Sequence, residues 1–228
     1  MNNQLGYIIE NWEEPQYPVH QSMEGRFCRL EPLNTKRHAS ELYDAFSSDH
    51  DDVWAYLPYG PFKDKEAYTV WLQTICDNHD PQFYAVIDLK SEQALGLASY
   101  LRISPKAGSI EVGHICFSSQ LQQTAAATET MYLMMQYIFA LGYRRYEWKC
   151  NALNQRSCQA ARRLGFTFEG TFRQAGVVKG RNRNTAWFSI LDKEWPKVQK
   201  GFQQWLSPEN FKMDGTQRQS LQALRDSR

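Results

Sequence analysis

A polar stretch that runs directly into an apolar segment is the first place where this sequence could bind a ligand. The stretch reads Gln120-Leu121-Gln122-Gln123-Thr124-Ala125-Ala126-Ala127, and the apolar residues after it predict a helix over 124–141. N–H groups at a helix start lack partners and attract phosphate oxygens, and alanine side chains leave that backbone open to a bulky anion. Because alanines also favour helices that bind nothing, the pattern permits an anion site without requiring one.

A second segment combines helix-capping residues with a hydroxyl inside the helix. Asn154 precedes a predicted helix over 155–164 and Gly165 follows it, as N-cap and C-cap residues typically do. Phe166 then fits a buried position after the helix. Capping and packing explain these residues, but they give no reason for Ser157, one turn into the helix. Ser157 is therefore a candidate for chemistry.

The elements that would position these residues alternate between strands and helices. Hydrophobic periodicity and turn residues predict strands over 26–33, 83–89, 94–103, 109–117, 143–150, 166–174 and 184–191. The same signals predict helices over 34–46, 64–76, 124–141, 155–164 and 192–206. This order indicates an α/β (α+β) fold with a mixed, largely antiparallel sheet flanked by helices. Ligands of open α/β sheets bind where strands separate at their carboxyl ends.

Length and charge limit the kind of protein. A chain of 228 residues fits one large domain, which we expect at 25–206, between an N-terminal arm (1–24) and a polar C-terminal tail (207–228). Its 26 Lys and Arg residues balance 25 Asp and Glu residues, so bulk charge does not predict binding to nucleic acid. The mean hydropathy is −0.61 and the apolar segment 125–141 is shorter than a span of about 20 residues, so no membrane partner is expected.

The cysteines and histidines do not form a metal or disulfide pattern. The five cysteines are odd in number and never spaced as C-x-x-C, which favours reduced thiols in a cytoplasmic protein. No secretory signal is apparent in residues 1–24. The run Asp49-His50-Asp51-Asp52 contains metal-ligand types, but contiguous residues converge poorly on one ion. We expect a solvated loop there and no metal site.

Taken together, the two motifs resemble a known family. From about Arg26 to Trp195 the chain resembles the GCN5-related N-acetyltransferases (GNAT), and within them the branch of ribosomal-protein alanine and serine N-acetyltransferases. The family loop signature Gln/Arg-x-x-Gly-x-Gly/Ala reads here as Gln120-x-x-Gln123-x-Ala125, with Gln123 in the glycine position. Ala127-Thr128-Glu129-Thr130 matches the helix start of that branch. Asn154-x-x-Ser157 followed by Leu164-Gly165-Phe166 matches the second motif.

The resemblance implies acetyl-CoA as the co-substrate, with coenzyme A as product. The pantetheine arm is expected on strand backbone at Cys116, Phe117 and Ser118. The pyrophosphate is expected on the N–H groups of Gln122, Gln123, Thr124, Ala125, Ala126 and Ala127. Asn154 would hydrogen-bond the cofactor or a bound water, and the Ser157 hydroxyl would donate to the departing thiolate. Some members of the family use a tyrosine acid seven residues after the asparagine, but this chain has Ala161 there.

The resemblance also implies that an amine attacks the thioester directly, so the amine must first lose a proton. A peptide α-amine, with a pKa near 8, needs only a modest base, whereas a lysine amine has a pKa near 10.4. Glu111, on the strand entering the site, is the first candidate base and His114 the second. A solvated carboxylate and a structural histidine are the alternatives for these two residues.

The acceptor is the least determined part of the prediction. The loop from Trp54 to Phe62 lies where the family covers the acceptor site, and Trp54, Tyr56 and Tyr59 would form its aromatic wall, with packing as the alternative. The basic turn 179–184 would contact the cofactor's 3′-phosphate, an acidic peptide or RNA, or be merely solvated. We expect a monomeric or homodimeric acetyltransferase for a protein or peptide N-terminus. The alternatives are a small-amine acetyltransferase and an acyl-CoA-binding module without turnover.

Overall fold

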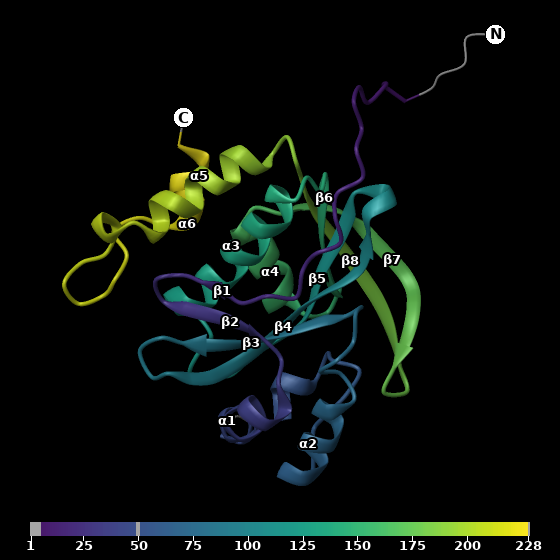
Figure 1. Ribbon diagram of the computed structural model, residues 1–228, viewed down its shortest axis with the longest axis vertical. Helices are drawn as coiled ribbons and strands as arrows, with labels where there is room; N and C mark the ends of the chain where they lie inside the picture. The colour runs from purple at the N-terminus through teal and green to yellow at the C-terminus, as the bar shows by residue number, and fades with distance from the viewer. Residues whose placement is uncertain (1–5, 49–50, 228) are drawn as a thin grey trace.

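The chain folds around one eight-stranded sheet, shown in Figure 1. The computed structural model describes residues 6–48 and 51–227. The strands are β1 (Met23–Glu24), β2 (Cys28–Pro32), β3 (Gln82–Asp88), β4 (Gln93–Ser104), β5 (Ser109–Phe117), β6 (Arg145–Asn151), β7 (Thr167–Val178) and β8 (Arg181–Leu191). Their order is β1-β2-β3-β4-β5-β6-β8-β7, and β5 with β6 is the parallel pair among antiparallel neighbours. The predicted mixed, largely antiparallel sheet is confirmed.

Helices cover both faces of this sheet. The α-helices are α1 (Thr35–Ser47), α2 (Lys65–Gln73), α3 (Ala125–Ala140), α4 (Gln155–Leu164), α5 (Trp195–Leu206) and α6 (Leu221–Asp226). Short 3₁₀ turns form η1 (Asp51–Trp54), η2 (Pro105–Ala107) and η3 (Pro208–Asn210). Side chains of Asn34, Asp64 and Thr124 each accept a hydrogen bond from an amide three residues on, which fixes the starts of α1, α2 and α3.

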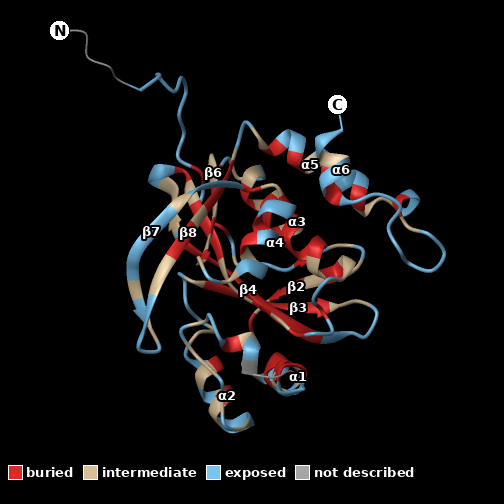
Figure 2. Cartoon of the chain, turned by 180° about the vertical axis from the view of Figure 1, so that it is seen from behind, coloured by how far each residue is buried: buried red, intermediate tan, exposed pale blue. Residues whose placement is uncertain are grey.

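Two hydrophobic cores lie on opposite faces of the sheet. Residues of α3, α4 and α5, such as Met134, Ala161 and Phe202, pack on one face, and residues of α1 and α2, such as Leu42 and Leu72, pack on the other. Figure 2 shows buried residues concentrated in the sheet and on the sides of the helices that face it. Since strand side chains alternate between faces, neighbouring residues of β5, β6 and β8 point to opposite faces of the sheet.

The β7–β8 hairpin is longer than the sequence predicted. Its strands reach Val178 and Arg181, whereas the prediction ended the first strand at 174 and began the second at 184. Lys179 and Gly180, with φ of 49° and 71°, form the two-residue turn. Most residues of β7 are exposed, and Figure 2 shows this strand at the edge of the sheet. The hairpin end lacks the hydrophobic alternation of a half-buried strand, which is why the prediction stopped short.

The buried Glu129 of α3 fixes the turn before β2. Its carboxylate accepts hydrogen bonds from the amides of Arg26, Phe27 and Cys28 at 2.8, 2.6 and 2.9 Å. Gly25 lies so close to this carboxylate that a β-carbon there would come within 2.4 Å of it. The short strand β1, which the sequence analysis assigned to the arm, precedes this turn and pairs with β2.

The segment after α5 returns to the domain. Leu221 of α6 is buried, and the α-carbon of Arg225 lies 2.9 Å from the β-carbon position of Gly201 in α5. Arg225 also donates to the carbonyls of Arg162 and Arg163 at 3.3 and 2.9 Å, at the end of α4. Within the described residues, no helix is long and apolar enough to cross a membrane.

Candidate active site

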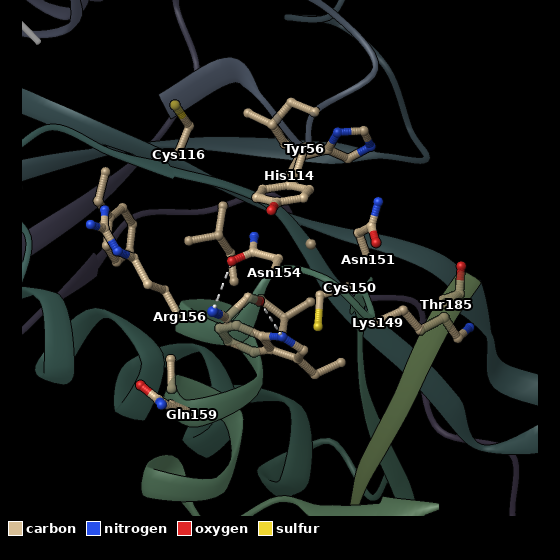
Figure 3. A pocket seen from close by; sticks show the side chains of 18 of the residues that line it. Tyr56, His114, Cys116, Lys149, Cys150, Asn151, Asn154, Arg156, Gln159 and Thr185 are labelled. Carbon is tan, nitrogen blue, oxygen red and sulfur yellow. Dashed lines mark hydrogen bonds between the residues drawn. The ribbon is translucent and has the colours of Figure 1, made fainter. Parts of the chain in front are cut away.

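The site forms where β5 and β6 separate. Their parallel pairing covers Ser109–Val112 against Arg145–Trp148 and goes no further in the described chain, although β5 stays paired with β4 as far as Phe117. A cavity of about 1770 Å³ opens at this point. Figure 3 shows Tyr56 and His114 on one side of the opening and Arg156 and Gln159 on the other. Strand separation therefore creates the crevice that the sequence predicted.

Two halves of the cavity carry different residues. What we call the α4 half is lined from α3 and α4, including Ala127, Asn154 and Ser157. What we call the hairpin half is lined from β4, β5, β6 and β8 by Arg102, Glu111, His114, Lys149, Arg183, Thr185 and Trp187. Glu111, Lys149 and Trp187 alternate along their strands with residues of the core that contains α3 and α4, so they lie on the opposite face of the sheet.

Gln123 has a left-handed backbone immediately before α3. Its φ is 62°, a conformation that costs a non-glycine residue about 1–2 kcal/mol. Gln123 occupies the position that is glycine in the family signature, and it adopts the left-handed backbone that glycine favours. The Gln122 side chain donates to the Phe117 carbonyl at 2.7 Å and ties this turn to the end of β5.

Only part of the predicted phosphate-binding backbone is free to donate. The amides of Gln122, Thr124 and Ala127 already donate to Ser118 O, Leu121 O and Thr124 Oγ1. In the described part of the chain, no hydrogen bond engages the amides of Gln123, Ala125 and Ala126. The α3 start therefore offers three backbone donors beside small side chains, which suits a phosphate.

The α4 start is built by its cap, as predicted. Asn154 Oδ1 accepts the Ser157 amide at 3.1 Å, and Gly165 ends the helix with a φ of 103°. The hydroxyl oxygen of Ser157 accepts the indole N–H of Trp148 at 3.0 Å. Both contacts are drawn as dashed lines in Figure 3. The Ser157 hydroxyl proton is used in neither contact, and the Cys150 side chain is a further hydrogen-bond partner of this hydroxyl.

A chain of ion pairs crosses the hairpin half. Glu111 is 3% exposed, and its Oε2 accepts from Arg102 at 2.7 Å and from the Lys149 ammonium at 2.8 Å. Lys149 also contacts Glu147 at 2.7 Å and lies 3.8 Å from the Trp187 ring centre. Glu111 is thus a buried carboxylate in contact with two cations rather than a solvated strand-edge group.

His114 lies at an irregularity in β5. Its φ is 51°, and the β4–β5 register shifts at this point. Its Nδ1 shares a 3.2 Å hydrogen bond with the Tyr59 hydroxyl. Burial, together with the positive charges of Arg102 and Arg183, lowers the pKa of His114 to about 4. The imidazole is therefore neutral at neutral pH.

The predicted aromatic wall divides between the core and the cavity. Trp54 is buried against Phe46 and Phe62 and does not line the cavity, so packing, the alternative weighed for it, describes its position. Tyr56 lines the cavity and donates to the Leu153 carbonyl at 3.3 Å. Tyr59 reaches the site through His114, and burial raises the pKa of its phenol well above 10.

The other predicted residues distribute unevenly. The following line the cavity: Glu111, His114, Cys116, Phe117, Gln122, Gln123, Ala127, Asn154 and Ser157. Ser118, Thr124, Ala125 and Ala126 are not among the residues that line it. Ser118 is fully buried, and its hydroxyl oxygen has no hydrogen-bond partner in the described chain.

Sequence reasoning missed several cavity residues. Arg102, Lys149, Arg163 and Arg183 line the cavity, but only Arg183 had been noted, inside the predicted basic turn. Arg163 donates to Thr128 Oγ1 at 3.2 Å beside the α3 start. Alternation of Glu147 and Lys149 within a strand was an available signal, because charged residues at every second position indicate a polar face.

Between residues 6–48 and 51–227, no group of three or more His, Cys, Asp or Glu side chains could hold a metal ion. Asp49 and His50 of the acidic run lie outside the described residues.

Comparisons with known proteins match this geometry. The family model described as "Acetyltransferase (GNAT) domain" matches residues 28–167. The chain is similar to a GCN5-related N-acetyltransferase from Brucella melitensis (TM-score 0.94, 45% identity, 96% of this chain and 100% of that one). It is also similar to a probable GNAT-family acetyltransferase from Chromobacterium violaceum ATCC 12472 (TM-score 0.79, 42% identity, 84% of this chain and 96% of that one).

More distant similarity concerns the fold alone. A ribosomal-protein-serine acetyltransferase structure from Vibrio cholerae, itself named as putative, aligns with a TM-score of 0.65 at 14% identity over 75% of this chain and 97% of that one. No curated protein is significantly similar to the chain in sequence.

Proposed function

The chain belongs to the GNAT acetyltransferase family, and we propose that it transfers the acetyl group of acetyl-CoA to the α-amine of a protein or peptide N-terminus. The observation that carries this acceptor is the environment of the two candidate bases in the hairpin half, His114 and Glu111. The pKa of His114 is about 4, and Glu111 is paired with two cations. At pH 7 about a tenth of α-amines are neutral, but under a thousandth of lysine amines. A weak base therefore suffices for the α-amine and not for lysine.

The α4 half fits acetyl-CoA. When bound, acetyl-CoA supplies the activated thioester carbonyl that the amine attacks. The free amides of Gln123, Ala125 and Ala126 would hold its pyrophosphate, and Arg163 adds a positive charge beside them. Cys116 and Phe117, on the separated part of β5, line the cavity where the pantetheine arm would run.

Ser157 would protonate the leaving thiolate. Its oxygen accepts the Trp148 indole N–H, so its own proton is not engaged in that contact and can be donated. Asn154 holds the helix start that presents Ser157 and leaves its amide nitrogen toward the cavity for the cofactor or a water.

Glu111 or His114 would accept the amine proton, directly or through water. Both line the same half of the cavity; Glu111 contacts two cations there, and the lowered pKa of His114 leaves its imidazole neutral at neutral pH. No covalent acyl-enzyme is needed. Burial raises the pKa of the cavity cysteine Cys150 to about 12, so this residue stays a thiol and is a poor nucleophile.

Placement among the ribosomal-protein alanine and serine acetyltransferases is a finer proposal. It is supported by the sequence Ala127-Thr128-Glu129-Thr130 at the α3 start, and the Vibrio cholerae structure adds only the fold. We also propose a cytoplasmic monomer or homodimer, on the cysteine pattern and the single domain.

The test is acetyl-CoA-dependent thiol release with a panel of acceptors. Peptides with a free N-terminus should react, and the same peptides with a blocked N-terminus should not. Lysine-bearing blocked peptides should react at least about a hundredfold more slowly, following the neutral fractions above. Reaction with polyamines or other small amines alone would replace the peptide assignment by a small-amine acetyltransferase.

A further inference from the structure

Arg183 lines the hairpin half of the cavity from β8. Arg183, Thr185 and Trp187 occupy alternate positions of this strand, and all three line the cavity. Across the hairpin, Arg183 pairs with Gly176 of β7, which also lines the cavity. A β-carbon at Gly176 would meet nothing within 4 Å, so there is open space beside this arginine.

The guanidinium of Arg183 is oriented but not neutralised. Its Nε–H donates to Thr185 Oγ1 at 3.2 Å, which fixes the plane of the group. In the part of the chain that the structure describes, Arg183 makes no ion pair. Arg102 and Lys149, by contrast, contact Glu111 at 2.7 and 2.8 Å. A half-buried arginine without a carboxylate partner is unusual, because the group is costly to desolvate unpaired.

The charges of the hairpin half favour an anion. Arg102 and Lys149 are paired with the carboxylates of Glu111 and Glu147, which leaves Arg183 as the cation of this half without an ion pair in the described chain. The other carboxylate in the described cavity lining, Asp52, is exposed on η1. Arg102 and Arg183 both act on His114, whose pKa they lower, so their charges are felt at the site of attack. A polycationic acceptor would meet repulsion here.

We propose that Arg183 binds a carboxylate of the acceptor, so the substrate is a peptide with an acidic residue close to its free N-terminus. This inference rests on the proposed function and narrows its substrate class. The two terminal amino groups of Arg183 match the two oxygens of a carboxylate, a pairing in which both hydrogen bonds are charge-assisted. Arg183 lies in the basic segment 179–184, one of whose expected partners was an acidic peptide.

The experiment compares kcat/KM for acidic and amide peptides. C-terminally amidated peptides carry Asp or Asn at the first, second or third position and are otherwise identical. The wild-type enzyme should prefer Asp by about tenfold or more at one position, the size expected for a hydrogen-bonded charge pair. Arg183→Gln should abolish this preference, and Arg183→Glu should turn it into a preference for Lys over Asn at that position.

Arg181→Gln is the matched control. Arg181 is exposed on the same strand, does not line the cavity and carries the same charge, so this variant should keep the Asp preference. Equal kcat/KM for the Asp and Asn peptides in the wild-type enzyme would overturn the inference about Arg183. A preference for Asp that survives Arg183→Gln would also overturn it. Neither result would affect the proposed acetyltransferase function. If none of the acceptors causes thiol release although acetyl-CoA raises Tm, the proposed function is overturned and the inference with it.

Discussion

Replacing His114 by asparagine tests the electrostatics of the hairpin half. The backbone at His114 is left-handed, with a φ of 51°, and asparagine tolerates this region better than most residues. The asparagine side-chain oxygen can accept the Tyr59 hydroxyl in place of Nδ1. The variant therefore removes the titrating imidazole and keeps the local shape.

The magnitude follows from the two protonation equilibria. Burial, with Arg102 and Arg183, lowers the pKa of His114 from 6.5 to about 4 in the folded protein. Between these values the unfolded chain binds a proton that the folded chain does not. The stability that neutral His114 contributes is thus fully present above pH 6.5 and is lost as the pH falls to 4. The loss amounts to about 3 kcal/mol.

Urea unfolding of both proteins at pH 7, 6, 5 and 4 measures this contribution. The free energy of unfolding should fall more steeply for the wild-type protein, so that its difference from His114→Asn changes by about 3 kcal/mol in favour of the variant. His20 and His38, whose pKa values are also lowered by burial, titrate in both proteins and cancel. A difference that stays constant between pH 7 and 4 would refute the assignment of a buried, neutral imidazole.

Three further substitutions test other parts of the site. Ser157→Ala should lower kcat about tenfold or more with little change in acetyl-CoA affinity, and should lower the free energy of unfolding by about 1–3 kcal/mol because Trp148 loses its acceptor. Equal losses in turnover and affinity would make Ser157 a binding residue. Gln123→Gly should raise the free energy of unfolding by about 0.5–1 kcal/mol, because glycine adopts the left-handed backbone without strain. The control Gln120→Gly should not raise it. A lower free energy of unfolding for Gln123→Gly than for the wild-type protein would contradict the strain argument. Glu111→Gln should flatten the acid limb of the pH–rate profile, and an unchanged profile would exclude Glu111 as the base.

Local signals predicted the frame of the site well. The helix 155–164 begins and ends where Asn154 and Gly165 indicated, since both ends are set by residues with specific capping geometry. The apolar helix predicted over 124–141 forms as Ala125–Ala140, with Thr124 as its cap. These elements carry the two motifs, which is why the family resemblance and the site could be found in sequence.

Contacts between residues far apart in the chain could not be predicted from the sequence. Lys149 and Arg102 meet Glu111 because three strands lie side by side, and no spacing in the chain encodes that neighbourhood. Trp54 was predicted in a loop beside the acceptor site, but its large ring is buried in the core formed with α1 and α2. The basic segment 179–184 was predicted as a hairpin turn, whereas the turn is confined to Lys179 and Gly180 and Arg181–Arg183 are paired with β7.

The contact between Arg225 and the end of α4 couples two distant parts of the chain in local unfolding. Arg225 donates hydrogen bonds to the carbonyls of Arg162 and Arg163, so the last turn of α4 cannot unfold without breaking its contact with α6. Amide hydrogen exchange should therefore report one opening free energy for both segments. Any ligand that orders the start of α4 would raise the opening free energy of both segments. Slower hydrogen exchange of the α6 amides would then report that the cavity is occupied, although α6 lies outside the site.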